Sequence, residues 1–189
     1  MKIILTVIFT FIVLAILGVI FIYSGIYNVS AIKPETGITK WVLETTSDNS
    51  VEHHAKGIQV PDLNDSAMIK EGFVHYKEMC ESCHGAPGQK ETDLAKGLNP
   101  HAPNLSRSGE EMSAEELFWV TKNGIKMTGM PAWGKTHSDN KIWAIIAAVK
   151  KLHEISPEEY NSYSQNIDEK NMNESKVLLQ HNKPKLRYH

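Results

Sequence analysis

The chain opens with its most apolar stretch, because no charged residue occurs between Ile3 and Tyr27. At 1.5 Å per residue, a helix of 25 residues is roughly 37 Å long, and the hydrocarbon core of a bilayer is ~30 Å thick. Residues 1–27 are therefore predicted to be a single transmembrane anchor. The alternative is a cleaved signal peptide, with Val29-Ser30-Ala31 as the cleavage site, although its apolar core is usually only about 7–15 residues long.

The segments that flank the rest of the chain lack a clear apolar pattern. Residues 28–65 combine weak periodicity with prolines, glycines and a polar run at 45–50. They are predicted to be a tether with a short ordered piece near Trp41. Residues 161–189 are polar with a basic end, which predicts a flexible or peripherally packed tail.

Between these segments, the apolar positions predict three helices and no strands. Apolar residues recur at three- and four-residue steps from Ser66, a plausible N-cap. A second helix begins at the capping box Ser113-Ala-Glu-Glu116 and ends at Asn123-Gly124. A third begins near Ser138 and ends before Pro157, and the connections read as loops. Residues 66–160 are therefore expected to form an all-α domain.

Composition removes several classes of function. A chain of 189 residues with a formal net charge of −2 is too short for a large multidomain enzyme and lacks the basic character of most nucleic-acid-binding domains. Its two cysteines cannot provide a disulfide framework.

Both cysteines lie in one pentapeptide, Cys80-Glu-Ser-Cys83-His84, which is the attachment motif of haem c. Thiols three positions apart lie on roughly one side of a helix, where each can add to one vinyl group of the porphyrin. His84 then follows directly and can reach the iron. The motif predicts one haem c bound through Cys80 and Cys83, with His84 as an axial ligand.

The cysteine pair has two alternative interpretations. A thioredoxin-like redox motif requires a βαβ context, which the pattern lacks. A zinc site requires a second pair of ligands, and only histidines remain to provide them.

Because thioethers form outside the cytoplasm, haem c also predicts the topology: the anchor lies in the cytoplasmic membrane and the domain is on its periplasmic side.

A six-coordinate iron needs a second axial ligand, for which Met130 is the leading candidate. Met130 precedes Pro131 in a glycine-rich loop between two helices, and proline restricts the backbone of the residue before it to extended geometry. Met127 is the near alternative. The remaining candidates are Met112, His101, His137 and His153.

Residues 66–155 resemble a class I cytochrome c domain, most closely that of bacterial membrane-anchored monohaem cytochromes. Gly72 and Tyr76 resemble the glycine and aromatic of the family's first helix, where the small residue lets the first and last helices cross closely. Trp143 resembles the aromatic that meets this crossing. Residues 102–105, Ala-Pro-Asn-Leu, resemble the loop whose proline carbonyl accepts a hydrogen bond from the ligand histidine. This resemblance implies a contact between Pro103 and His84, and residues 124–133 resemble the loop of the methionine ligand.

The resemblance implies an electron carrier rather than an enzyme: one electron passes between redox proteins or a respiratory complex, and no catalytic residue or small-molecule substrate is expected. An alternative is a cytochrome subunit of a larger oxidase, reductase or dehydrogenase. A second alternative is an enzyme or gas sensor in which Met130 does not hold the iron. Lys122, Lys126 and Lys135 are either a docking patch for an acidic partner or a solvated loop face.

Overall fold

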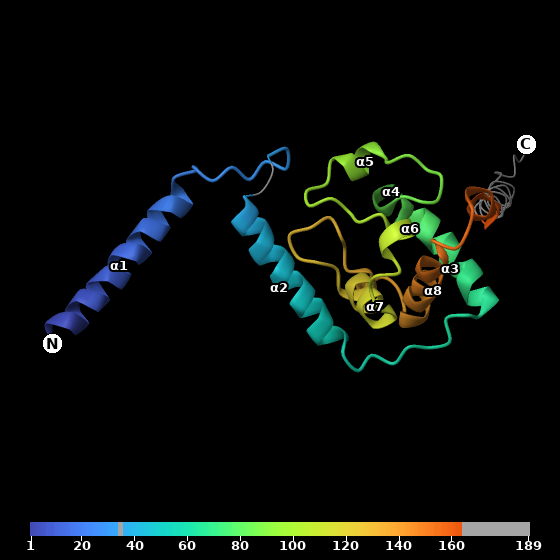
Figure 1. The fold of residues 1–189 in the computed structure, drawn as a ribbon, viewed down its shortest axis with the longest axis horizontal. Coiled ribbons are helices and arrows are strands. Elements are labelled where there is room, and N and C mark those ends of the chain that lie inside the picture. The colour runs from blue at the N-terminus through green and yellow to red at the C-terminus, as the bar shows by residue number, and fades with distance from the viewer. Residues whose placement is uncertain (34–35, 164–189) are drawn as a thin grey trace, which may run out of the picture. The chain divides into compact units, whose positions relative to one another are not determined.

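The computed structural model describes residues 1–33 and 36–163, and they form helices and loops without a strand (Figure 1). The predicted tail, 161–189, lies almost entirely outside the described residues. The chain divides into two units, Met1–Thr36 and Gly37–His189. The helices are α1 (Lys2–Tyr23), α2 (Gly37–Ala55), α3 (Ser66–Met79), α4 (Glu81–His84), α5 (Asp93–Lys96), α6 (Leu105–Ser108), α7 (Ala114–Asn123), the 3₁₀ turn η1 (Trp133–Lys135) and α8 (Asp139–Lys151).

The first unit contains one helix, α1, which has 22 residues and no buried side chain. It is long and apolar enough to cross a membrane, and it is the single such helix among the described residues. The predicted apolar helix at the start of the chain is therefore present.

The core of the second unit is the contact between α3 and α8. Gly72 of α3 lies directly against the backbone of α8: a Cβ at this position would be 2.6 Å from the carbonyl carbon of Ala144 and 2.9 Å from Ala148 Cβ. Only glycine allows this approach. Trp143, expected at the crossing, stacks on Phe118 of α7 with ring centroids 4.1 Å apart, so it joins α8 to α7.

Local capping residues explain where the helices begin. The capping box of α7 is present, with the Ser113 side chain accepting from the Glu116 N–H and the Glu116 side chain accepting from the Ser113 N–H. Helix α8 begins where predicted, with Ser138 as its N-cap. The N-cap of α3 is Asp65 rather than Ser66, because the Asp65 carboxylate accepts from two backbone N–H groups of the first turn.

The structure corrects the tether within residues 28–65, because 37–55 form the regular helix α2. Val51 and Ala55 are buried, and the ring of His54 lies 5.4 Å from that of Trp119 on α7. Trp41, at the expected ordered piece, is itself 66 % exposed. The contact stripe is limited to Val51, His54 and Ala55, so its apolar periodicity is too weak to predict the helix.

The chain after α8 returns to the core. Residues 157–163 are helical, and Tyr160 is buried with its ring 6.0 Å from Phe73 and 6.5 Å from Tyr76. Tyr163 stacks on Phe73 at 4.6 Å. The packed part of the chain therefore continues beyond the predicted boundary at residue 160.

Candidate functional site

The cysteine motif lies where α3 gives way to the short helix α4. The Cys80 N–H donates to Tyr76 O at 2.8 Å, which completes the last turn of α3. The N–H groups of Cys83 and His84 both donate to Cys80 O, at 3.1 and 2.9 Å. Cys80, Cys83 and His84 therefore belong to one hydrogen-bonded helical turn.

The Cys80 thiol is a protected, neutral group. Neither forms a disulfide: Cys80 is buried and Cys83 is half-buried. Burial, and then the neighbouring Cys83, raises the pKa of Cys80 to about 12. Redox-active Cys-x-x-Cys pairs have thiols with lowered pKa values, so this environment argues against a thioredoxin-like role.

His84 is oriented by a hydrogen bond to the carbonyl group of Pro103. Its Nδ1 lies 2.9 Å from Pro103 O, which is the contact implied by the family resemblance. Because a carbonyl oxygen only accepts, Nδ1 carries the proton and Nε2 keeps its lone pair. Burial lowers the pKa of His84, and the bond to Pro103 opposes this shift in part. The imidazole is therefore held in the neutral form that binds metals.

The methionine loop between α7 and η1 separates its two methionines. Met127 is 87 % exposed and has a positive φ of 61°. Met130 is half-buried, its N–H is bound by Thr128 Oγ1 at 3.1 Å, and its carbonyl accepts from Ile125 N at 3.3 Å. The backbone at Met130 is thus fixed from two sides, whereas the Met127 side chain extends into solvent.

A comparison with protein families matches residues 67–147 to the family described as cytochrome c oxidase, cbb3-type, subunit III. Residues 67–147 are a c-type cytochrome domain. The match leaves out α1 and α2, and a comparison with curated proteins found no match. The matched residues include the cysteine motif, Pro103 and Met130.

The residues of the cytochrome domain fit a covalently bound haem. Two unpaired thiols stand three positions apart, and the next residue offers a neutral, oriented imidazole nitrogen. A soft thioether sulfur lies in a separate, backbone-fixed loop. This donor set suits haem iron, and among the described residues no cluster of three or more His, Cys, Asp or Glu side chains offers an alternative metal site.

The other candidate ligands have different surroundings. Met112 packs against the hydrophobic core, and Lys150 donates to its carbonyl oxygen. The His153 ring is 2.6 Å from Glu110. His101 is exposed near Glu91, and His137 contacts the rings of His75 and Trp133.

Three further hydrogen bonds from side-chain hydroxyl groups hold the motif and the residue that follows it, and they are not predicted from the sequence. The Tyr76 hydroxyl donates to Gly85 O at 2.6 Å, and Thr92 Oγ1 donates to Ser82 O at 2.5 Å. The Tyr160 hydroxyl donates to Glu81 Oε2 at 2.7 Å, across 79 positions of sequence. A carboxylate inside the motif was the available signal, but its partner lies beyond the last predicted helix.

The three lysines considered as a docking patch are not equivalent. Lys122 Nζ lies 2.7 Å from Asp139 Oδ1 and 5.4 Å from the centre of the Phe118 ring. It therefore joins the end of α7 to the start of α8. Lys126 and Lys135 are exposed.

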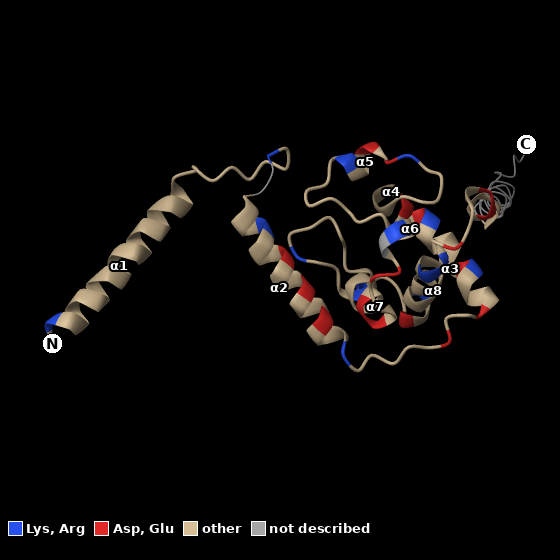
Figure 2. Ribbon diagram, viewed as in Figure 1, with Lys and Arg blue, Asp and Glu red and all other residues tan. Residues whose placement is uncertain are grey.

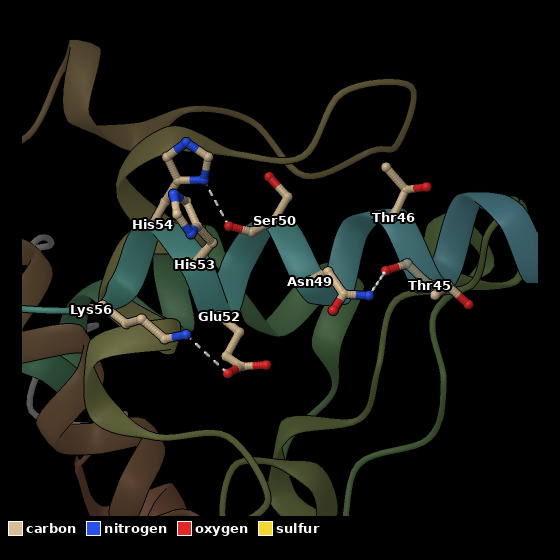
Figure 3. Close-up of a pocket in the computed structure, with 8 residues that line it drawn as sticks. All are labelled: Thr45, Thr46, Asn49, Ser50, Glu52, His53, His54 and Lys56. Carbon is tan, nitrogen blue, oxygen red and sulfur yellow. Dashed lines mark hydrogen bonds and ion pairs between the residues drawn. The ribbon is translucent and has the colours of Figure 1, made fainter.

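A hollow runs along α2, and none of the residues that line it belongs to the cysteine motif (Figure 3). Its lining consists of polar side chains on α2 and Lys56, which directly follows it. Several of these bind one another: His54 Nδ1 lies 2.8 Å from Ser50 O, and Lys56 lies 3.3 Å from Glu52. None of the residues predicted to bind haem lines this hollow.

Proposed function

We propose that this chain is a membrane-anchored electron carrier with one haem c, bound through Cys80 and Cys83 and coordinated by His84 and Met130. The observation that carries the proposal is the hydrogen bond between His84 Nδ1 and Pro103 O, formed directly beside the cysteine pair of a c-type cytochrome domain. This bond leaves Nε2 free for the metal and fixes the direction of the ring.

The side chains then have distinct tasks. Cys80 and Cys83 retain the group by covalent bonds, and His84 presents a neutral nitrogen. Met130 presents a soft thioether, which favours the reduced metal and raises the potential relative to a second histidine. Haem c supplies the one-electron couple, and transfer requires no substrate-binding or acid–base residue from this chain.

Helix α1 supports anchoring in the cytoplasmic membrane, and attachment of haem c outside the cytoplasm supports a periplasmic location for the domain. Partners are then other redox proteins that reach or share this membrane. Measuring the mass of the mature protein tests the anchor: loss of the first 31 residues would identify a cleaved signal peptide instead.

The ligand assignment is tested by visible and near-infrared spectra of the protein produced with a haem-maturation system. The oxidised protein is expected to show a weak near-infrared sulfur-to-iron band that Met130→Ala abolishes and Met127→Ala retains. Met127→Ala is the matched control, because it removes a thioether from the same loop. A wild type without the band, whose reduced form binds carbon monoxide, would instead indicate a sensor or an enzyme.

The family match favours a second candidate, a cytochrome subunit of a larger oxidase. In that case the chain is expected to co-purify with other polypeptides at fixed stoichiometry after extraction in mild detergent. A chain that disperses as a monomer with its haem retained supports the free carrier.

A further inference from the structure

Exposed large apolar side chains are concentrated in one short part of the chain beyond α1. The described residues between 26 and 43 include eight of them, whereas the described residues 44–163 have only Val60, Leu94 and Met127. The eight are Ile26, Tyr27, Val29, Ile32, Ile38, Trp41, Val42 and Leu43. Scattered single apolar residues are ordinary on a surface, but such a concentration marks a contact region.

Two of the residues of this region on α2, Ile38 and Val42, lie on the side of the helix that faces away from the cytochrome domain. Val42 and the buried Val51 are nine positions apart, about two and a half turns of helix, so they point to opposite sides of α2. Ile38 is 78 % exposed and lies on the same side as Val42 by helical spacing. Trp41 is 66 % exposed and lies on the flank of the helix, between Ile38 and the side that carries Ala55. No described part of the cytochrome domain covers them.

The outward face of α2 changes character along its length. Beyond Ile38 and Val42, the same face of the helix continues at steps of three and four through Thr45, Asn49 and Glu52. The side chains of these last three residues are polar (Figure 3). The apolar end is thus the end that the chain connects to α1, and the polar end is the far one.

Charge follows the same direction. Lys33 and Glu35 precede α2 and Lys40 lies in its first turns, so two lysines outnumber one carboxylate there, whereas the carboxylates Glu44, Asp48 and Glu52 follow further along. Figure 2 shows blue near the beginning of α2 and red beyond it. An anionic bilayer surface attracts lysines and repels carboxylates, so this order favours a membrane at the beginning of α2.

The chain connection limits how far this end can be from the membrane. Residues 24–36 separate α1 from α2, and 13 residues span at most about 45 Å when fully extended. If α1 crosses the bilayer, the beginning of α2 remains close to its surface.

We propose that the beginning of α2, residues 37–43, is a membrane-interface segment, with Ile38, Trp41 and Val42 inserted among the lipid headgroups of the bilayer that holds α1. Tryptophan at this position is typical of membrane interfaces. The inference goes beyond the proposed electron transfer and rests only on its membrane anchor. Because Val51 and Ala55 attach the far end of α2 to the cytochrome domain, α2 acts as a rigid arm about 28 Å long rather than as a flexible tether.

The full-length, haem-loaded protein in vesicles of phosphatidylcholine and phosphatidylglycerol provides the test. Single nitroxide labels are placed by Val42→Cys, by Asn49→Cys on the polar part of the same helix face, and by Leu14→Cys within α1. Wild type is the labelling control, since haem attachment consumes both native thiols. For each label, electron paramagnetic resonance measures collisions with oxygen, which concentrates in lipid, and with a water-soluble nickel chelate.

The ratio of oxygen to nickel collisions is expected to rise from label 49 to label 42 and again to label 14. The double substitution Ile38→Glu with Trp41→Glu is expected to remove the difference between labels 42 and 49, while Lys56→Glu preserves it. A label 42 as water-accessible as label 49, with label 14 deep in lipid, overturns the proposal and leaves the anchor intact. A label 42 shielded from both reagents indicates a protein partner and also overturns it. A water-accessible label 14 refutes the anchor itself.

Discussion

Gly124, at the end of α7, is the position where one added methyl group acts most directly on the methionine loop. Its backbone has φ 66° and ψ −178°, a region that is almost exclusive to glycine. A Cβ at this position would lie 2.7 Å from Met130 O, 2.8 Å from Ala132 N and 2.8 Å from Pro131 C. All three are backbone atoms, so no side-chain rotation can relieve the overlap.

Two costs therefore combine in Gly124→Ala. The unfavourable backbone region costs about 1–3 kcal/mol, and overpacking against fixed atoms costs about 1–3 kcal/mol more. Gly57→Ala separates them, because Gly57 has a positive φ of 84° with no atom within 4 Å of the added Cβ. We expect about 1–2 kcal/mol of destabilisation for Gly57→Ala and about 2–6 kcal/mol for Gly124→Ala.

The overlap also predicts a spectroscopic effect. Moving the backbone of residues 130–132 by several tenths of an ångström disturbs the proposed ligand Met130, since a ligand must be placed within about 0.5 Å. Gly124→Ala should therefore weaken the near-infrared sulfur-to-iron band and lower the reduction potential, whereas Gly57→Ala leaves both unchanged. Denaturant unfolding and a redox titration measure the two effects. Equal destabilisation of the two variants, with an unchanged band in Gly124→Ala, would refute the reasoning.

Three other substitutions test the packing around the site. Gly72→Ala places a methyl group against the Ala144 carbonyl and should destabilise the domain by about 3 kcal/mol, as measured by thermal unfolding. In the control Gly97→Ala, the Cβ would have ordinary contacts of 3.5 and 3.6 Å, so stability should change little. Burial, and then the hydrogen bond to Glu81, raises the pKa of Tyr160. The stabilisation that the neutral Tyr160 hydroxyl gives the folded state is therefore complete below the unfolded tyrosine pKa of about 10. It is lost as pH rises through the higher pKa of the folded state. Tyr160→Phe should therefore lower the neutral-pH unfolding free energy by about 1–2 kcal/mol and flatten its decline above pH ~10, and an unchanged alkaline slope would contradict this. Ser113→Ala removes the α7 cap and should cost about 1 kcal/mol in urea unfolding, with no change in the haem spectrum.

The parts of the structure that the sequence predicts are those encoded by nearby residues. A capping box needs only the four residues from Ser113 to Glu116, and the cysteine motif needs five. The contact between His84 and Pro103 spans 19 positions and required the family resemblance, since no local rule selects this carbonyl. The all-α organisation followed from apolar periodicity over α3, α7 and α8.

The missed features depend on contacts between distant residues. Helix α2 contacts the domain through Val51, Ala55 and the His54 ring, a stripe too small to show as an apolar repeat. The predicted domain boundary puts Tyr160 at the edge of the domain, yet this residue is buried because it packs against the rings of Phe73 and Tyr76 on α3. In both cases the partner surface, and not the segment itself, decides the local structure.

The two halves of the candidate site are held by different physical means, and this difference predicts how they respond to change. The cysteine motif is tied by side-chain hydrogen bonds from Tyr76, Thr92 and Tyr160, so the loss of one bond leaves the others and mainly lowers stability. The methionine loop is set by the close approach of its backbone to Gly124 and by Thr128. A displacement there moves the Met130 backbone itself, so substitutions in this loop should alter the reduction potential before they unfold the domain.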